Sequence, residues 1–313
     1  MDRIICVVGP TASGKTALAV RLALALCGEV VSCDSMQIYR RMDIGTAKPA
    51  PAELCGVRHH MLDVAEPDES YSVSRFVQEA DVCVQEILAR GKTVILVGGT
   101  GLYIDALVAG RRFAPYPQTG KREALELRAD REGMQALLQA LRAVDPDAAE
   151  RLHPADRKRI LRALEVYEET GKTITQHNLE TQQVPPKYSP VWIGLDMQPR
   201  QLLYDRIDLR VDQMLQAGLF SEVQALLHEG VPIEATSMQA IGYKEVAACL
   251  HGGLSRQDAV AQIKKASRNY AKRQLTWFRR NPAIHWITRQ ENTTETEIFE
   301  KALAVATAFD REE

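Results

Sequence analysis

Short apolar runs alternate with segments of helical periodicity along most of the chain. The apolar runs are rich in Val and Ile, which is typical of buried strands in a parallel sheet. They predict strands at 3–8, 29–35, 58–64, 93–97, 191–195 and 284–288. The periodic segments predict helices at 16–26, 73–89, 155–170, 200–217, 256–280 and 294–308. Because strands and helices alternate, the pattern predicts an α/β fold with a parallel sheet.

Two proline-containing joints, at 113–117 and 184–190, bracket a stretch predicted to be purely helical. Such joints are typical of domain boundaries. We therefore expect an all-helical insert at 118–187 within a core formed by residues 1–117 and 188–313.

Residues 9–16 read GPTASGKT and match the phosphate-binding pattern G-x-x-x-x-G-K-[ST], between a predicted strand and a predicted helix. Glycine lets the backbone approach a phosphate, and the loop amides and the helix N-terminus face the anion. Lys15 adds a positive charge, and the Thr16 hydroxyl can reach a phosphate-bound Mg²⁺, which makes Thr16 the predicted metal ligand. The core is then a P-loop kinase-like sheet. The predicted diphosphate-binding residues are Gly9, Pro10, Thr11, Ala12, Ser13, Gly14, Lys15 and Thr16.

A carboxylate is predicted beside this loop. Asp34 ends the second predicted strand, and ligands gather at the carboxyl ends of strands in open α/β sheets. The strand at 93–97 ends in Gly98-Gly99-Thr100, where an ordinary P-loop NTPase carries a magnesium-binding acid. This weakens the ATPase and GTPase interpretations. Two reactions remain possible: phosphoryl transfer by a kinase with Asp34 as the base, and alkyl transfer with pyrophosphate as the leaving group. Asp34 could also act as an indirect magnesium ligand.

Charge is uneven along the chain, although the net charge is only −2. The segment 256–280 has eight Lys or Arg and one acid, and helical spacing places Lys264, Arg268 and Lys272 on one face. This favours a surface for nucleic acid or phosphate over a merely solvated basic face. Trp277 and Phe278 lie on the apolar stripe of the same helix and are expected in the core.

Several function classes are disfavoured by composition. The six cysteines show no zinc-like spacing and are expected to be reduced thiols of a cytoplasmic protein. No apolar run approaches the ~20 residues of a membrane span, and nothing requires more than a monomer. His59 and His60 point to opposite faces of their predicted strand, so a structural role is expected for both.

Five separated motifs carry a resemblance to a known family. GPTASGKT, CDSMQIYRRMDIGTAKP, GGTGLY, SMQAIGYKE and NYAKRQLTWFRR occur in this order, and together they closely resemble the tRNA dimethylallyltransferases, the MiaA-type isopentenyltransferases. The resemblance covers nearly the whole chain. It implies that the core binds dimethylallyl diphosphate and passes the prenyl group to the exocyclic amine of the adenosine just 3′ of the anticodon. The resemblance also implies that the base is flipped out for the reaction and that the insert holds the anticodon stem-loop.

The resemblance also implies roles for residues. Asp34 would orient or deprotonate the amine, Thr100 would lie near the reacting centre, and Arg206 or Arg210 would reach the pyrophosphate, with the choice between them open. Arg206 and Arg210 could instead pair with Asp205 and Asp208 on the helix surface. The predicted tRNA-binding residues are Asp34, Ser35, Met36, Gln37, Thr100, Arg122, Lys158, Arg159, Ile160, Leu161, Arg162, Gln239, Lys272 and Arg273. For Gln239, capping of the backbone in its turn is the alternative.

Three other functions compete with tRNA prenylation: prenyl transfer to a free adenine nucleotide, phosphoryl transfer by a P-loop kinase, and RNA binding without catalysis. The insert and the basic helix argue against a mononucleotide, which offers few phosphates to hold. A kinase would use ATP as its donor. Intact Lys15, Thr16 and Asp34 argue against a protein that only binds RNA.

Overall fold

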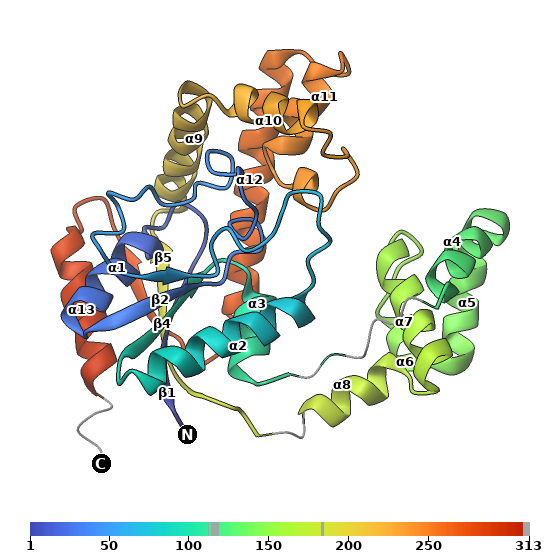
Figure 1. The fold of residues 1–313 in the computed structure, drawn as a ribbon, viewed down its shortest axis with the longest axis horizontal. Helices are drawn as coiled ribbons and strands as arrows, with labels where there is room; N and C mark the ends of the chain where they lie inside the picture. The colour runs from blue at the N-terminus through green and yellow to red at the C-terminus, as the bar shows by residue number, and fades with distance from the viewer. Residues whose placement is uncertain (112, 114–118, 183–184, 309–313) are drawn as a thin grey trace. The chain divides into compact units, whose positions relative to one another are not determined.

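The structure is a computed structural model that describes residues 1–111, 113, 119–182 and 185–308. The chain divides into two compact units, which are drawn in Figure 1 and described separately below. One comprises Met1–Gly110 and Lys187–Glu313, and the other comprises Arg111–Pro186. Most of the proline joint predicted at 113–117, and the boundary predicted at 117–118, lie outside the described residues.

The larger unit is built on a six-stranded sheet in which all pairs are parallel. Its strand order is β3-β2-β4-β1-β5-β6. The strands are β1 (Arg3–Val8), β2 (Gly28–Ser32), β3 (His59–His60), β4 (Thr93–Gly98), β5 (Ser189–Met197) and β6 (His285–Arg289). The predicted α/β class with a parallel sheet is therefore confirmed.

The strand predicted at 58–64 was too long, because only His59 and His60 are extended and paired. Met61 and Asp63 follow with positive φ angles of 63° and 56°. Left-handed backbone cannot continue a strand, so the segment turns away after two residues.

Helices cover both faces of the sheet (Figure 1). Ile5 and Val7 of β1 pack with α1 and α13 in one core cluster. Ile4 and Cys6, which alternate with them, pack with α2 and α3 in the other. The helices of this unit are α1 (Lys15–Ala25), α2 (Val73–Ala89), α3 (Gly101–Val108), α9 (Arg200–Gln216), α10 (Leu219–His228), the short 3₁₀ helix η1 (Ser237–Gln239), α11 (Tyr243–Leu250), α12 (Arg256–Phe278) and α13 (Glu295–Ala308).

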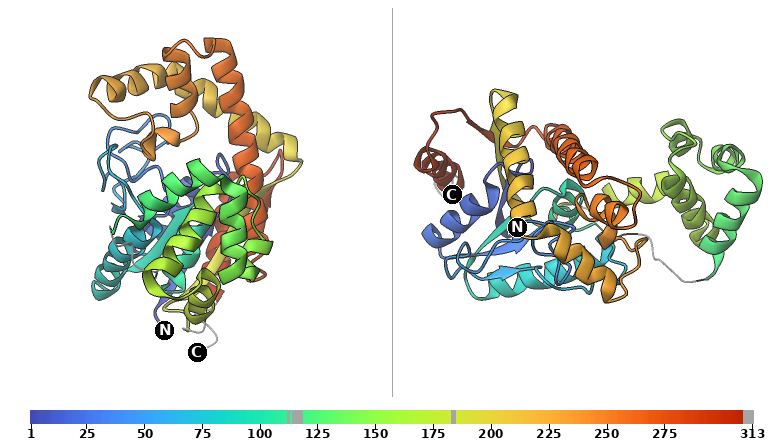
Figure 2. Two further views of the ribbon diagram at one scale, coloured as in Figure 1. Left: turned by 90° about the vertical axis from the view of Figure 1, so that its right-hand side faces the viewer. Right: turned by 90° about the horizontal axis from the view of Figure 1, so that it is seen from above.

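Helix α11 packs against both α10 and α12, and the three lie close together in Figures 1 and 2. Ser255 caps α12 by accepting a hydrogen bond from the Asp258 amide at 3.0 Å. Phe278, at the other end of α12, is 2% exposed and belongs to the core, as predicted. The helix thus reaches from a solvent-facing first turn to the centre of the unit.

The smaller unit is helical throughout its described residues. It contains α4 (Lys121–Glu132), α5 (Met134–Val144), α6 (Pro146–Glu150), α7 (Arg157–Thr170) and α8 (Ile174–Gln182). Its core is apolar and includes Leu125, Leu137, Leu141 and Leu164. Gly171 ends α7 with a φ of 70°, a backbone conformation in which glycine is not strained.

None of the described helices is both long and apolar enough to cross a membrane.

Candidate active site

The phosphate-binding loop joins β1 to α1 at the carboxyl edge of the sheet. Gly9 has a φ of 151°, and a Cβ there would lie 2.8 Å from the Leu195 carbonyl oxygen, so only glycine fits. Gly14 caps α1 with a φ of 91°. The hydroxyl oxygen of Ser13 is buried and has no hydrogen-bond partner among the described residues. An unpaired hydroxyl inside a cradle of amides suits a phosphate oxygen.

Lys15 begins α1 and donates a hydrogen bond from Nζ to the Pro10 carbonyl at 3.1 Å. Burial, together with the nearby positive charge of Arg210, lowers the pKa of Lys15 from 10.5 to about 8, while Asp34 opposes this change. A bound diphosphate would add negative charge beside the ammonium group and favour its protonated form.

Asp34 and Thr100 extend from neighbouring strands, β2 and β4. Asp34 Oδ1 accepts hydrogen bonds from the amides of Met36 at 2.9 Å and Gln37 at 3.4 Å. Thr100 Oγ1 accepts from the Ser35 amide at 3.1 Å and donates to the Ser35 hydroxyl at 3.3 Å. The carboxylate and the threonine are therefore held in one network, at the edge where the sequence predicted them.

A close approach of backbones explains the glycine that ends β4. A Cβ on Gly98 would lie 2.3 Å from the Cys33 carbonyl oxygen, so an acidic side chain cannot occupy this position. The magnesium-binding acid of ordinary P-loop NTPases is thus excluded here by packing as well as by sequence.

The two arginines of α9 point at the phosphate-binding loop and not at the acids beside them. Arg206 Nε donates to the Ala12 carbonyl at 3.1 Å. Arg210 donates to the Thr11 hydroxyl at 3.4 Å and to the Ala47 carbonyl at 3.3 Å. The alternative in which they pair with Asp205 and Asp208 is wrong, because Gln201 donates to Asp205 and Arg268 pairs with Asp208.

Two cavities meet at this network. The smaller, about 60 Å³, is polar and includes Lys15 and Thr16 in its wall. The larger, about 310 Å³, has an apolar wall from α9 and α12. The walls of both cavities include Thr11, Asp34, Thr46, Arg210 and Tyr270. A phosphate site and an apolar site thus adjoin at one carboxylate.

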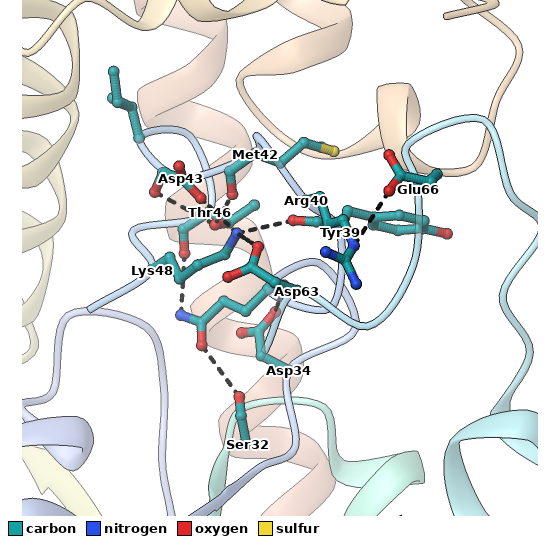
Figure 3. Close-up of polar contacts among 12 residues, drawn as sticks. Ser32, Asp34, Tyr39, Arg40, Met42, Asp43, Thr46, Lys48, Asp63 and Glu66 are labelled. Carbon is teal, nitrogen blue, oxygen red and sulfur yellow. Dashed lines mark hydrogen bonds and ion pairs between the residues drawn. The ribbon is translucent and has the colours of Figure 1, made fainter. Parts of the chain in front are cut away.

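The loop after Asp34 forms part of both walls and is tied down by polar side chains (Figure 3). Figure 3 shows Lys48, whose side chain is only 6% exposed, pointing toward Asp43, Asp63 and the Tyr39 carbonyl. Gln37, predicted to line a flipped base, donates instead to the Thr46 and Ala47 carbonyls at 3.3 and 3.2 Å. Its side chain therefore holds the loop.

Glu222 of α10 anchors the same loop. Its carboxylate accepts the amides of Asp43, Ile44 and Gly45 at 2.9, 2.8 and 3.0 Å. It also accepts the Tyr243 hydroxyl at 2.5 Å. Glu222 could not be recognised from sequence, because it lies about 180 residues from the three amides that it binds and belongs to no motif.

The basic face predicted on α12 is largely paired within the protein. Lys264 lies 2.6 Å from Asp212, and Arg268 lies 2.6 Å from Asp208. This corrects the expectation of an open basic face at these two positions. Lys272 and Arg273 lie over the rings of Tyr204 and Tyr270, and Arg273 also borders the larger cavity.

Tyr270 and Gln274 are site residues that the sequence interpretation missed. Both border the smaller cavity with Asp34. Burial and the charge of Asp34 raise the pKa of Tyr270 to about 12, so its hydroxyl stays protonated and can donate. Their spacing of one helical turn places them on one face of α12, and this spacing was the available signal.

Met36 and Gln239 border the larger cavity. Gln239 also donates to the Ile233 carbonyl at 2.7 Å, the backbone-capping role weighed for it from sequence.

In the helical unit the predicted RNA-binding residues fall into two groups. Lys158 and Arg159 are exposed, and Arg122 and Arg162 both lie near the buried Glu165 carboxylate, at 3.7 and 3.0 Å. The side chains of Ile160 and Leu161 are 0% and 1% exposed and pack in the core. This corrects their assignment to the RNA surface, because buried side chains cannot contact a partner.

Among the described residues, no group of three or more His, Cys, Asp or Glu side chains lies close enough together to hold a metal ion. Thr16 and Asp34, however, border the same polar cavity. Mg²⁺ usually takes only one or two protein oxygens, with phosphate oxygens and water completing its shell. This donor set therefore fits a phosphate-bound Mg²⁺.

The fold and the site together define an α/β protein with a phosphate-binding loop motif beside an apolar cavity and a carboxylate. Comparison with known proteins gives the family. The IPP transferase family matches residues 37–281, and the chain belongs to it. The family resemblance predicted from the five motifs is thus confirmed.

Similar proteins extend over most of the chain. The tRNA dimethylallyltransferase of Caldanaerobacter subterraneus subsp. tengcongensis is 46% identical over 95% of both chains. That of Carboxydothermus hydrogenoformans is 45% identical over 97% of both. The tRNA isopentenylpyrophosphate transferase of Bacillus halodurans has a TM-score of 0.75 and 40% identity, covering 100% of this chain and 98% of that one. A eukaryotic dimethylallyltransferase, solved in crystallographic snapshots acting on tRNA, has a TM-score of 0.87 and 29% identity, covering 100% of this chain and 80% of that one.

Proposed function

We propose that this protein transfers a dimethylallyl group from dimethylallyl diphosphate to the exocyclic amine of the adenosine immediately 3′ of the anticodon in tRNA. The observation that carries the proposal is the shared wall of the two cavities, where Asp34 borders a phosphate-binding site on one side and an apolar site on the other. Family membership supports both the donor and the acceptor.

The diphosphate is assigned to the P-loop. Its oxygens would contact the loop amides, Lys15 and the Ser13 hydroxyl that lacks a partner among the described residues. We assign the diphosphate contact to Arg210, because it borders both cavities and donates to the Thr11 hydroxyl. Arg206 borders neither of these two cavities and contacts the loop through the Ala12 carbonyl, beside a third cavity that it lines together with Arg210 and Lys15. As the bond from carbon to oxygen breaks, negative charge grows on the departing pyrophosphate, and these fixed positive groups stabilise it.

The acceptor amine is assigned to Asp34. The amine nitrogen attacks the first carbon of the prenyl group, the bond to the bridging oxygen breaks, and one amine proton must leave. Both backbone hydrogen bonds of Asp34 use Oδ1, so Oδ2 is the oxygen that we assign to this proton. The prenyl chain would lie against Ile207, Val211 and Met214 of α9, which form part of the apolar wall.

Mg²⁺ is the proposed cofactor, held by Thr16 and the diphosphate, with Asp34 near enough in the same cavity wall to bind its water shell. When bound, it would supply further positive charge to the leaving group.

Lys158, Arg159 and the paired Arg122 and Arg162 are the proposed tRNA contacts of the helical unit, and Arg273 and Gln239 are proposed contacts at the larger cavity. We also propose that the protein is a monomer and acts in the cytoplasm. Its six free cysteines support the cytoplasmic location.

The proposal is tested by incubating the purified protein with Mg²⁺, unmodified tRNA and dimethylallyl diphosphate, with ATP as a parallel donor and AMP as a parallel acceptor. Nuclease digestion and mass spectrometry then identify the product. We expect prenylated adenosine from tRNA and none from AMP. Prenylated AMP would favour the free-nucleotide alternative, and phosphate transfer from ATP without a prenyl product would favour the kinase.

A further inference from the structure

Gln274 of α12 is a buried polar side chain whose two ends bind two different loops of the site. It is 4% exposed. Its Oε1 accepts the Thr11 amide at 2.8 Å, and its Nε2 donates to the Gly99 carbonyl at 3.0 Å. One amide group therefore joins the P-loop to the β4–α3 loop.

These two contacts continue into the groups assigned to the reaction. Thr11 receives the Arg210 hydrogen bond on the diphosphate side. Gly99 precedes Thr100, whose hydroxyl holds Ser35, the residue after Asp34. An unbroken path of hydrogen bonds and covalent links thus runs from the phosphate cradle through Gln274 to the carboxylate.

Packing fixes the distance that Gln274 spans. A Cβ on Gly99 would lie 2.0 Å from Gln274 Nε2, so the loop approaches as closely as glycine allows. A Cβ on Gly101 would lie 2.2 Å from Trp277, which also donates from Nε1 to Asp105 at 2.8 Å. Contacts one turn further along α12 therefore hold it against α3, the helix that follows this loop.

We propose that Gln274 is a positioning residue that sets the spacing between the P-loop and the Asp34–Thr100 pair. The inference rests on the proposed function, because prenyl transfer needs the carbon held by the diphosphate to lie within about 3–3.5 Å of the amine. Gln274 acts through the two loops and touches neither reacting atom.

Two variants distinguish the two hydrogen bonds of Gln274. Gln274→Met keeps the volume and removes both hydrogen bonds. Gln274→Glu keeps an acceptor for the Thr11 amide, but its ionised form has no donor for the Gly99 carbonyl. Gln262, exposed on the same helix, provides the matched control Gln262→Met. For each protein we would measure prenyl-transfer kcat on tRNA, pyrophosphate affinity by calorimetry, tRNA affinity and thermal stability.

We expect Gln274→Met to lower kcat by roughly 10- to 100-fold, with much smaller changes in pyrophosphate and tRNA affinity. Gln262→Met should match the unmodified protein. The deficit of Gln274→Glu should shrink as pH falls, because a protonated carboxyl can donate to the Gly99 carbonyl again. With a structural role alone, thermal stability and both affinities would fall and recover in parallel with kcat.

An unchanged kcat in Gln274→Met would overturn the inference, as would parallel losses of kcat and both affinities. If Gln274→Met does not fold, full activity of Gln274→Glu at high pH would overturn it. If the protein without substitutions binds pyrophosphate but yields no prenylated tRNA, the proposed function is refuted instead.

Discussion

Glu29, at the start of β2, provides a test of how the sheet that carries Asp34 is stabilised. Its side chain is 3% exposed and contacts three basic groups: His60 at 2.7 Å, Arg90 at 2.7 Å and Lys92 at 2.9 Å. Burial alone would raise its pKa, but hydrogen bonds from Lys92, His60 and Arg90 lower the pKa of Glu29 from 4.5 to about 2.

The size of the effect follows from this difference in pKa. The fall from 4.5 to about 2 corresponds to about 3 kcal/mol of folding free energy when the carboxylate is ionised. Arg90 and Lys92 are 35% and 45% exposed, so solvent screening reduces the value to roughly 2 kcal/mol. Because the pKa is lowered in the folded state, this stability is present above pH 4.5 and is lost as pH falls toward 2.

We expect Glu29→Gln to lower the free energy of unfolding by roughly 2 kcal/mol at pH 7. Urea denaturation of both proteins should show the difference narrowing by about 1 kcal/mol between pH 7 and pH 3.5. Glu291→Gln, a change at an exposed acid, is the control and should be nearly neutral at both pH values. A difference for Glu29→Gln that stays constant down to pH 3.5 would refute the reasoning.

Three further predictions concern the site. Asp34→Asn should lower prenyl-transfer kcat by about 10²- to 10⁴-fold with tRNA affinity nearly unchanged; loss of tRNA affinity in a binding assay would mean that its role is misassigned. Lys15→Ala should weaken pyrophosphate binding in calorimetry by at least tenfold, or about 1.4 kcal/mol, and equal affinity would remove Lys15 from the diphosphate site. Replacing the exposed Lys158 and Arg159 with Gln should reduce the slope of log affinity for tRNA against log salt by roughly 1 to 2. Arg162→Gln is the comparison. It should change this slope less, because Arg162 is already paired with Glu165.

Local motifs predicted much of the site. The phosphate-binding loop could be recognised because it follows a local sequence pattern of eight residues, in which Gly14 answers a local backbone requirement with its φ of 91°. Asp34 could be placed because parallel strands end at one edge of the sheet, whereas Thr100 was placed only by the family resemblance. The predicted helices of the core, and its predicted strands except that at 58–64, were close to those observed, since strong periodicity reflects burial. Helices α3, α10 and α11 were not predicted.

What sequence could not supply was the pairing of charges across elements. In the sequence alone, Lys264 and Arg268 form a basic stripe on one face of a helix. Only the folded structure shows Asp212 and Asp208 of α9 opposite them. The same limit applies to Ile160 and Leu161, which lie within a basic run yet face the core. Whether a polar side chain faces solvent or pairs with another helix depends on residues that are far away in the sequence.

The contact of Glu222 with three successive backbone amides has a consequence for how this protein can vary. Every residue except proline offers an amide, so these three hydrogen bonds do not depend on the side chains at positions 43 and 44. The Asp43 side chain holds the loop separately, through its ion pair with Lys48. Gly45 is different, because a Cβ there would lie 2.3 Å from the Tyr243 ring. The hydrogen bonds of Glu222 therefore place no demand on the side chain at position 44, whereas position 45, in the wall of the larger cavity, admits only glycine while Tyr243 stays in place.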